Sequence, residues 1–210
     1  MKDSIFLTFD IDWASDEIIR EIAEELVEAK IKSTWFVTHD SPFLDFFRSR
    51  KDLFSLGIHP NFLEGTTHGD SEEEIIRKLM SIVPEAKVLR THSVFQYGKL
   101  MSKFVNLTPI TTDSSIFLPE MSNIKPIEHL TPHGSLKRIP IFWADDYELL
   151  KESSKWDPSK YFDIPGDKVF LFHPIHLELN TSNMKQYSDY KLGKINLNKN
   201  TDIGTKVFFR

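Results

Sequence analysis

Strand-like and helix-like segments alternate along this 210-residue chain, and this alternation constrains its fold more than any other feature. Runs of β-branched and aromatic residues predict strands, and segments with apolar residues at helical spacing predict helices between them. Alternation of this kind implies parallel strands joined by right-handed crossovers, in a barrel or an open sheet, with functional groups at the carboxyl ends of the strands. We expect strands over 4–12, 32–38, 53–59, 87–94 and 109–116, and helices over 15–30, 41–50, 71–83 and 97–105.

The second half of the chain is less regular. Residues 117–137 are rich in Pro, Ser, Asn, His and Gly and predict a long ordered loop over the site. Residues 138–143 and 168–173 are again typical of strands, whereas the polar tail after residue 180 gives no clear structural signal. Since the length suits one sizeable core, we expect a single domain over residues 1–210.

Composition excludes several classes of function. The formal net charge is −5 and the 26 basic residues are scattered, which argues against a nucleic-acid groove. Without cysteine there can be no disulfide framework or thiolate site, so any metal must be held by histidine and carboxylate. No apolar run approaches the ~20 residues of a membrane span, and the N-terminus shows no secretion signal. We therefore expect a cytoplasmic protein.

Two carboxylates, Asp10 and Asp12, end the first predicted strand. Residues at i and i+2 of a strand point to the same side, and two like charges placed together are costly unless a cation lies between them. A bound metal ion with a nearby water is the usual solution. The alternative is that the pair only precedes the next helix, which Ser15 or Asp16 would cap.

Histidines recur at later predicted strand ends, at His59, His92, His173 and His176. In this setting, Thr8–Asp12, Ser33–Thr38 and Gly57–His59 resemble, in order and spacing, the opening motifs of the NodB-type polysaccharide deacetylases, or carbohydrate esterase family 4. The segments Gly57–Phe62 and Arg90–Ser93 are most similar to its WbmS-like branch, which is associated with bacterial surface-polysaccharide gene clusters. The resemblance covers roughly residues 5–180.

This resemblance implies an α/β fold, a distorted (β/α) barrel with fewer than eight strands. It also implies that one divalent metal, commonly zinc, supports hydrolysis of N- or O-acetyl groups on a sugar or polysaccharide precursor. By position, Asp10 corresponds to the catalytic base and Asp12 to the metal-binding aspartate. The Asp-X-Asp spacing departs from the adjacent Asp-Asp of many members, although an Asp-X-Asp variant also occurs in the family.

The metal histidines match the family only in part. His59 corresponds to the first one, but the position four residues later, where the second is expected, is Leu63. The nearest candidate is His68, if the intervening loop folds back toward the strand end. His92 and His39 are the other candidates for this ligand.

Other motifs of the resemblance assign supporting roles. Arg90 corresponds to the arginine that orients the catalytic base, and His173 to the general acid, which Asp145 or Asp146 would hold in position. His176 would be a neighbouring supporting group, and His92 would contact substrate if it does not replace a ligand. Thr112–Ser115 resembles a further Asp-Ser-Ser element.

The leading hypothesis is therefore metal-assisted hydrolysis of an acetyl amide or ester on a sugar. One alternative is hydrolysis of another linear or cyclic amide by the same residues. Others are a carbohydrate-binding protein with a decayed metal site, which Leu63 favours, and a partner-binding scaffold. The sequence leaves open the sugar, N- or O-deacetylation, the metal and the oligomeric state.

Overall fold

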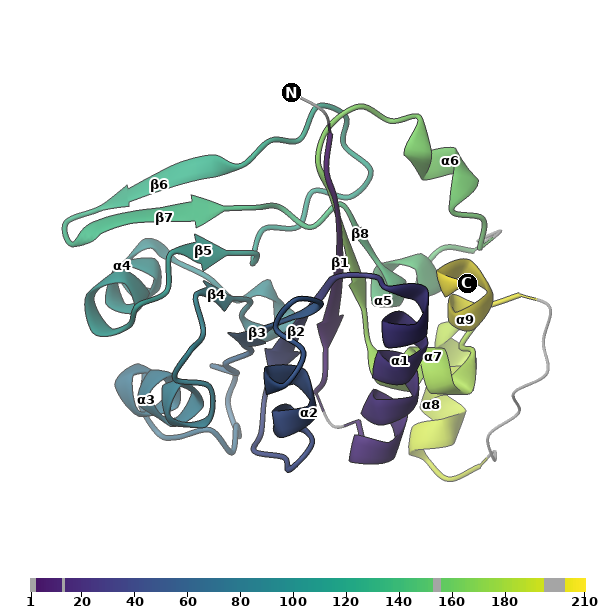
Figure 1. Ribbon diagram of the computed structural model, residues 1–210, viewed down its shortest axis with the longest axis horizontal. Coiled ribbons are helices and arrows are strands. Elements are labelled where there is room, and N and C mark those ends of the chain that lie inside the picture. The colour runs from purple at the N-terminus through teal and green to yellow at the C-terminus, as the bar shows by residue number, and fades with distance from the viewer. Residues whose placement is uncertain (1–2, 13, 153–155, 195–202) are drawn as a thin grey trace.

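A computed structural model describes residues 3–12, 14–152, 156–194 and 203–210, which form one curled sheet with helices packed around it (Figure 1). The strands are β1 (Ile5–Asp10), β2 (Ser33–Val37), β3 (Phe54–Ile58), β4 (Val88–Leu89), β5 (Thr112–Asp113), β6 (Ile127–Thr131), β7 (Gly134–Arg138), β8 (Trp143–Ala144) and β9 (Lys168–Phe172). The helices are α1 (Asp16–Ala29), α2 (Leu44–Arg48), α3 (Glu72–Ile82), α4 (Gly98–Leu107), α5 (Asp145–Leu149), α6 (Ser159–Phe162), α7 (Pro174–Leu179), α8 (Met184–Lys191) and α9 (Thr205–Phe209).

The sheet follows the order β6-β7-β5-β4-β3-β2-β1-β9-β8, so β1 lies inside it between β2 and β9. All neighbouring pairs are parallel except β6 and β7, which form an antiparallel hairpin. The sheet is open, with β6 and β8 at its edges, and the predicted α/β barrel-like class is confirmed. The described residues form nine strands, however, and the expectation of fewer than eight is wrong because the hairpin adds to the sheet.

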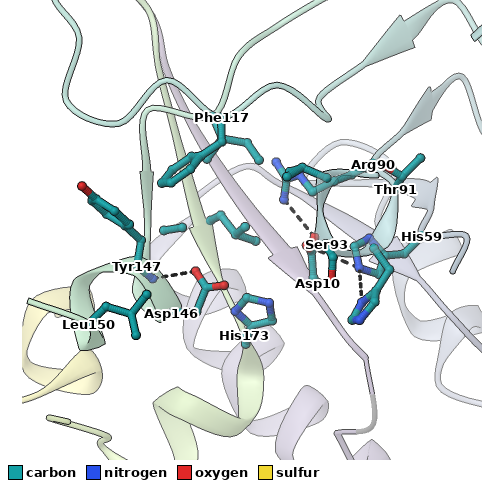
Figure 2. Close-up of a pocket in the computed structure, with 15 residues that line it drawn as sticks. Asp10, His59, Arg90, Thr91, Ser93, Phe117, Asp146, Tyr147, Leu150 and His173 are labelled. Atoms are coloured by element: carbon teal, nitrogen blue, oxygen red, sulfur yellow. Dashed lines mark hydrogen bonds and ion pairs between the residues drawn. The ribbon is translucent and has the colours of Figure 1, made fainter. Parts of the chain in front are cut away.

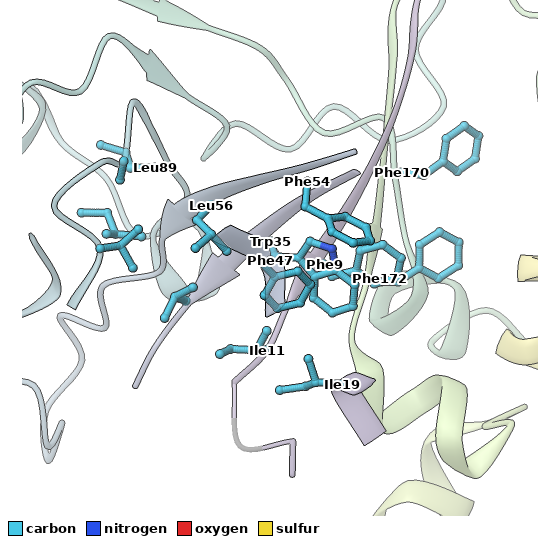
Figure 3. Packing of buried hydrophobic residues seen from close by; sticks show 14 of the residues in the cluster. Phe9, Ile11, Ile19, Trp35, Phe47, Phe54, Leu56, Leu89, Phe170 and Phe172 are labelled. Carbon is cyan, nitrogen blue, oxygen red and sulfur yellow. The ribbon is translucent and has the colours of Figure 1, made fainter. Parts of the chain in front are cut away.

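Side-chain alternation along the central strands separates two faces of the sheet. Phe9 of β1 points into the main core, where its ring stacks on Trp35 at 4.3 Å and lies 5.9 Å from Phe172 (Figure 3). Thr8 and Asp10, one position to either side, face the opposite way and reach the buried side chain of Arg90. The hydrophobic strand thus delivers a carboxylate to the inner face of the sheet.

The first helix forms as its sequence predicts. Ser15 caps α1 by accepting a hydrogen bond from the backbone N–H of Ile18, at 3.4 Å. The residues buried on α1 recur at helical spacing and pack into the main core: Ile19, Ile22, Ala23 and Leu26. The predicted α3 is likewise confirmed, with Ser71 as its cap.

Several predicted boundaries are wrong. β4 and β5 have two residues each. β4 is short because the chain leaves the sheet at Arg90 and makes a 3-10 turn over His92–Val94. The loop predicted over 117–137 contains β6 and part of β7, which lie at the sheet edge and not over the strands' carboxyl ends (Figure 1). The strand predicted over 138–143 is divided between the end of β7 and the start of β8.

The polar tail also contributes structure. In α9, Phe208 is buried and its ring stacks on Trp143 with centroids 4.2 Å apart, so the C-terminal segment completes the core. Among the helices of the described residues, none is both long and apolar enough to cross a bilayer.

Candidate metal centre and active site

The predicted site residues come together at the carboxyl ends of the parallel strands. Asp10 is the last residue of β1, His59 follows β3, and His173 follows β9. His92 follows β4 after two residues and begins the 3-10 turn. In α/β folds with parallel strands, this edge is where side chains from neighbouring strands can act together.

Asp10 forms a buried ion pair with Arg90. Its Oδ1 accepts a hydrogen bond from Arg90 Nη1 at 2.8 Å, and both side chains are buried. The contact between Arg90 and the carboxylate is not bidentate. Nη2 donates instead to Thr8 Oγ1 and Ser114 Oγ, and Nε donates to the Ser114 carbonyl. The Phe36 ring lies 4.3 Å from the guanidinium carbon. These contacts therefore hold the Arg90 side chain from several sides. Arg90 binds Asp10 through Oδ1 and not through Oδ2.

The Asp-Ser-Ser element supports this arginine. Ser114 receives two of the Arg90 hydrogen bonds, and the Ser115 hydroxyl accepts one from the Thr91 N–H at 2.9 Å. Asp113 binds Arg138 Nε at 2.7 Å. The sequence motif thus holds the turn after β4 and does not contribute a reacting group.

Asp12, His59 and His92 bring three donor atoms to one point. The distances are 3.4 Å from His59 Nε2 to Asp12 Oδ1, 3.2 Å from His92 Nδ1 to Asp12 Oδ1, and 3.3 Å between the two nitrogens. Asp12 lies beyond β1 and reaches this point through a left-handed backbone conformation, with φ at 35°, and not through strand alternation.

This donor set fits a divalent metal. Four ligands at about 2.1 Å in a tetrahedron around zinc are roughly 3.4 Å apart, close to the three distances found here. One carboxylate and two imidazoles are also a donor combination that zinc accepts. Burial acts to raise the pKa of Asp12, but hydrogen bonds from His59 and His92 outweigh it and hold that pKa well below its usual value. The carboxylate is thus kept ionised, as a ligand must be.

The structure places the other two candidate histidines differently. The loop after β3 does fold back, but His68 Nδ1 accepts a hydrogen bond from the Asn61 N–H at 3.0 Å, and the ring is outside the group of converging donors. His39 Nδ1 lies 2.8 Å from the Thr38 hydroxyl and is outside it as well. Of the three candidates, His92 is the one brought to Asp12 and His59 in the described residues.

Of the two predicted aspartates, Asp145 and Asp146, it is Asp145 that binds His173. Asp145 is fully buried at the start of α5 and accepts from both the backbone N–H and Nδ1 of His173, each at 2.7 Å. The other nitrogen, Nε2, lies 3.6 Å from Asp12 Oδ2 and faces the site. Burial acts to lower the pKa of His173, but the charge and hydrogen bond of Asp145 raise it well above its usual value.

Asp146 and His176 lie beside this pair. Asp146 is exposed, and its Oδ1 accepts from the Tyr147 N–H. His176 is buried, contacts Thr181 through Nδ1 at 3.3 Å, and packs edge-on against Tyr187. Burial lowers the pKa of His176 to about 4, so its ring is neutral near pH 7.

Asp145, His173 and His176 also place donor atoms within 4.8 Å of one another in the described residues. Because Asp145 already binds two groups of His173, we interpret this second cluster as a hydrogen-bonded pair with a neutral neighbour.

Two of the hollows in the described residues share His92 and His173 in their linings. The first, which we call the inner cavity, has a volume of about 330 Å³, and Figure 2 shows it between Asp10, Arg90 and His59 on one side and Phe117, Tyr147 and Leu150 on the other. Its lining is divided between the apolar or aromatic residues Val94, Phe117, Ile141, Ala144, Tyr147, Leu150 and Leu171 and the polar or charged residues Asp10, His59, Arg90, Thr91, His92, Ser93, Asp146 and His173. The second, the polar cleft, has a volume of about 590 Å³ and is lined by Asp12, Thr38, Asn61, Thr67, His68, His92, Asp146, His173, Ile175, His176, Met184, Tyr187 and Lys191.

Sequence reasoning missed the apolar wall and the residues around Arg90. Phe117 and Tyr147 come from irregular or helical segments far apart in the chain, and no local pattern pairs them. Thr8 and Ser114 lie inside the motifs Thr8–Asp12 and Thr112–Ser115, and strand alternation places Thr8 on the same face of β1 as Asp10.

Solved structures of other proteins share this fold. A protein from Bordetella bronchiseptica, assigned as a polysaccharide deacetylase involved in O-antigen biosynthesis, matches with a TM-score of 0.83 and 30% identity, over 98% of this chain and 87% of that one. A 4-alpha-glucanotransferase from Thermococcus litoralis shares the fold, with a TM-score of 0.57 and 13% identity over 99% of this chain and 38% of that one.

A mutant of a carbohydrate esterase family 4 pseudoenzyme from Bacillus anthracis also shares the fold, with a TM-score of 0.50 and 17% identity over 92% of this chain and 62% of that one. None of the curated proteins matches the chain. The model of the WbmS-like polysaccharide deacetylase family matches residues 7–191, which is most of the sequence. The chain belongs to the WbmS-like family of polysaccharide deacetylases.

Proposed function

We propose that this protein is a metal-dependent hydrolase that removes an acetyl group from an N- or O-acetylated sugar destined for a surface polysaccharide. The main observation in support is that Asp12, His59 and His92 converge next to both Asp10 and His173. Family membership supports a deacetylase, and the Bordetella relative, which is assigned to O-antigen biosynthesis, supports a surface-polysaccharide precursor as substrate.

Asp12, His59 and His92 would hold the metal, and their spacing favours zinc. When bound, a divalent ion supplies Lewis acidity, which polarises an acyl carbonyl and favours ionisation of water. The protein's own residues then determine where protons move.

Asp10 suits the role of general base. Arg90 anchors Oδ1, so the carboxylate has a fixed direction, and Oδ2 lies 3.7 Å from His59 Nε2 at the centre of the site. A positioned carboxylate can take the proton of a water molecule as that water attacks the acyl carbon.

His173 suits the role of general acid. Asp145 holds Nδ1, which directs Nε2 into the site, and the raised pKa of His173 keeps the ring protonated near neutral pH. Nε2 can then donate its proton to the departing amine or alcohol. The base Asp10 and the acid His173 thus approach different members of the candidate ligand set, His59 and Asp12 respectively.

The alternative function is a carbohydrate-binding protein whose metal site has decayed, which Leu63 at the expected position of the second metal histidine favours. That alternative requires a missing ligand, whereas His92 supplies a third donor from a different strand end. We therefore propose that the ligand has moved to another element and that catalysis is retained.

The test is acetate release from N-acetylated nucleotide sugars and oligosaccharides by zinc-loaded protein. We expect release that a chelator abolishes and that Asp10→Asn reduces to background while zinc remains bound. An Asp10→Asn protein that has lost zinc would show instead that Asp10 is a ligand. Absence of release from every acetylated sugar, with zinc bound, would contradict the proposed function.

A further inference from the structure

His92 lies on a turn whose backbone conformation is unfavourable for the residues that form it. The turn follows β4 and contains Ser93 and Val94, whose φ angles are 54° and 48°. Residues other than glycine seldom adopt positive φ, and a β-branched residue such as valine is especially unsuited to it. Such a backbone persists only where the surrounding structure holds it in place. The position of His92 therefore depends on contacts made outside the turn itself.

The start of this turn is held by β3 and by Ser115. The His92 N–H donates to the Pro60 carbonyl at 2.9 Å, which extends the pairing of β3 and β4 beyond both strands. The Thr91 N–H donates to Ser115 Oγ, also at 2.9 Å. Because Thr91 and Ser115 are both fully buried, this end of the turn is fixed against the sheet.

The end of the turn is held by the side chain of Gln96. Its Nε2 donates to the Ser115 carbonyl at 2.7 Å, and its Oε1 accepts a hydrogen bond from Arg138 Nη2. An amide suits both partners, because a carbonyl can only accept a hydrogen bond and a guanidinium can only donate one. Ser115 thus binds the turn at both ends, at Thr91 and at Gln96.

The partners of Gln96 are themselves fixed inside the protein. Arg138 is buried on β7, and its Nε donates to Asp113 Oδ2 at 2.7 Å. Asp113 is fully buried on β5, and its Oδ1 accepts from the Ser115 N–H at 3.1 Å and from the Ser115 hydroxyl at 2.5 Å. This network joins the two ends of the turn through the sheet, with His92 between them.

We propose that Gln96 positions His92 for metal binding by fixing the end of the turn to Ser115 and Arg138. The inference rests on the metal group of the proposed function and goes beyond it, because it adds a residue that is neither a metal ligand nor a reacting group. A ligand that occupies its place only part of the time lowers the apparent metal affinity by that fraction. Gln96 is therefore a positioning residue, which acts through His92.

The test is zinc affinity, measured by competition with a chelator, for the parent and for Gln96→Met. Methionine keeps the length of glutamine but makes neither hydrogen bond. Gln96 is an exposed residue, so the substitution leaves the core intact. Loss of the two hydrogen bonds should weaken zinc binding about tenfold, as is typical for residues that orient metal ligands.

Gln186 is the matched control. Its amide also donates and accepts, from Nε2 to the Leu179 carbonyl at 3.1 Å and to Oε1 from the Ser182 N–H at 2.9 Å. These hydrogen bonds hold the segment between α7 and α8, which carries none of the three converging donors. Gln186→Met should therefore bind zinc within about twofold of the parent.

A double variant separates positioning from a general loss of structure. If Gln96 acts through His92, adding Gln96→Met to His92→Ala should not weaken zinc binding any further. A general loss of structure would instead weaken zinc binding about tenfold in both backgrounds.

Zinc affinity of Gln96→Met within about twofold of the parent would overturn the inference. Equal losses in the parent and His92→Ala backgrounds, or in Gln96→Met and Gln186→Met, would overturn it as well. A parent that binds no zinc would refute both the inference and the metal dependence of the proposed function. Acetate release is measured separately, and its absence, with the zinc affinities as expected, would contradict the proposed function and leave the inference standing.

Discussion

Removal of the Arg90 side chain should destabilise this fold far more than removal of a surface arginine. Arg90 is fully buried and pairs with Asp10 at 2.8 Å, so Arg90→Met leaves a buried carboxylate without its partner. Breaking a buried ion pair in this way costs about 3 to 5 kcal/mol, and the hydrogen bonds to Thr8 and Ser114 are lost as well. This is a large fraction of the roughly 5 to 15 kcal/mol by which domains are stable.

The assay is urea unfolding of the parent, Arg90→Met, Asp10→Asn and the double variant, all in chelator so that metal binding does not contribute. Because Asp10→Asn removes the charge that Arg90→Met strands, the double variant should be more stable than the sum predicts by about 2 kcal/mol or more. Arg48→Met is the control, since the Arg48–Glu85 pair is partly exposed and should contribute at most about 1 kcal/mol. Single effects that add to within about 0.5 kcal/mol would refute the reasoning.

Three further predictions concern the acid and the C-terminal helix. His173→Ala should reduce amide hydrolysis ~10² to 10⁴-fold but barely affect an ester with an activated leaving group, whereas equal losses would assign His173 another role. Asp145→Asn removes the charge that raises the pKa of His173, so the loss of kcat at high pH should move to lower pH; an unchanged pH profile would contradict this. Phe208→Ala should cost about 3 to 5 kcal/mol in urea unfolding, because Phe208 is buried against Trp143, and a loss below about 1 kcal/mol would mean that α9 contributes little.

Local signals predicted much of the fold. The cap at Ser15 and the apolar spacing of α1 are properties of adjacent residues, and the structure confirms both. The hairpin of β6 and β7 was not predicted, because most of its residues are exposed and its sequence lacks the hydrophobic signal of a buried strand. The helix α9 was missed since its stability comes from the contact between Phe208 and Trp143, 65 residues apart in the numbering of the chain.

The candidate site divides in the same way. The pairing of Asp10 with Arg90 was expected from motif order, and the structure shows the ion pair. The sequence could not distinguish Asp145 from Asp146 as the partner of His173, because the two are adjacent aspartates. Only the position of α5 determines which of the two side chains points toward His173. The third donor could not be chosen from spacing, since His92 reaches the group through a 3-10 turn in which Ser93 and Val94 both have positive φ.

Zinc binding by the parent and by two single histidine variants tests the central claim most directly. Isothermal titration, with elemental analysis of the dialysed proteins, should give one zinc per chain for the parent and a loss of affinity of at least ~100-fold for His92→Ala, which removes a converging donor. His68→Ala should bind zinc nearly as the parent does, because its Nδ1 is engaged with Asn61. Loss of zinc in His68→Ala with retention in His92→Ala would contradict the account.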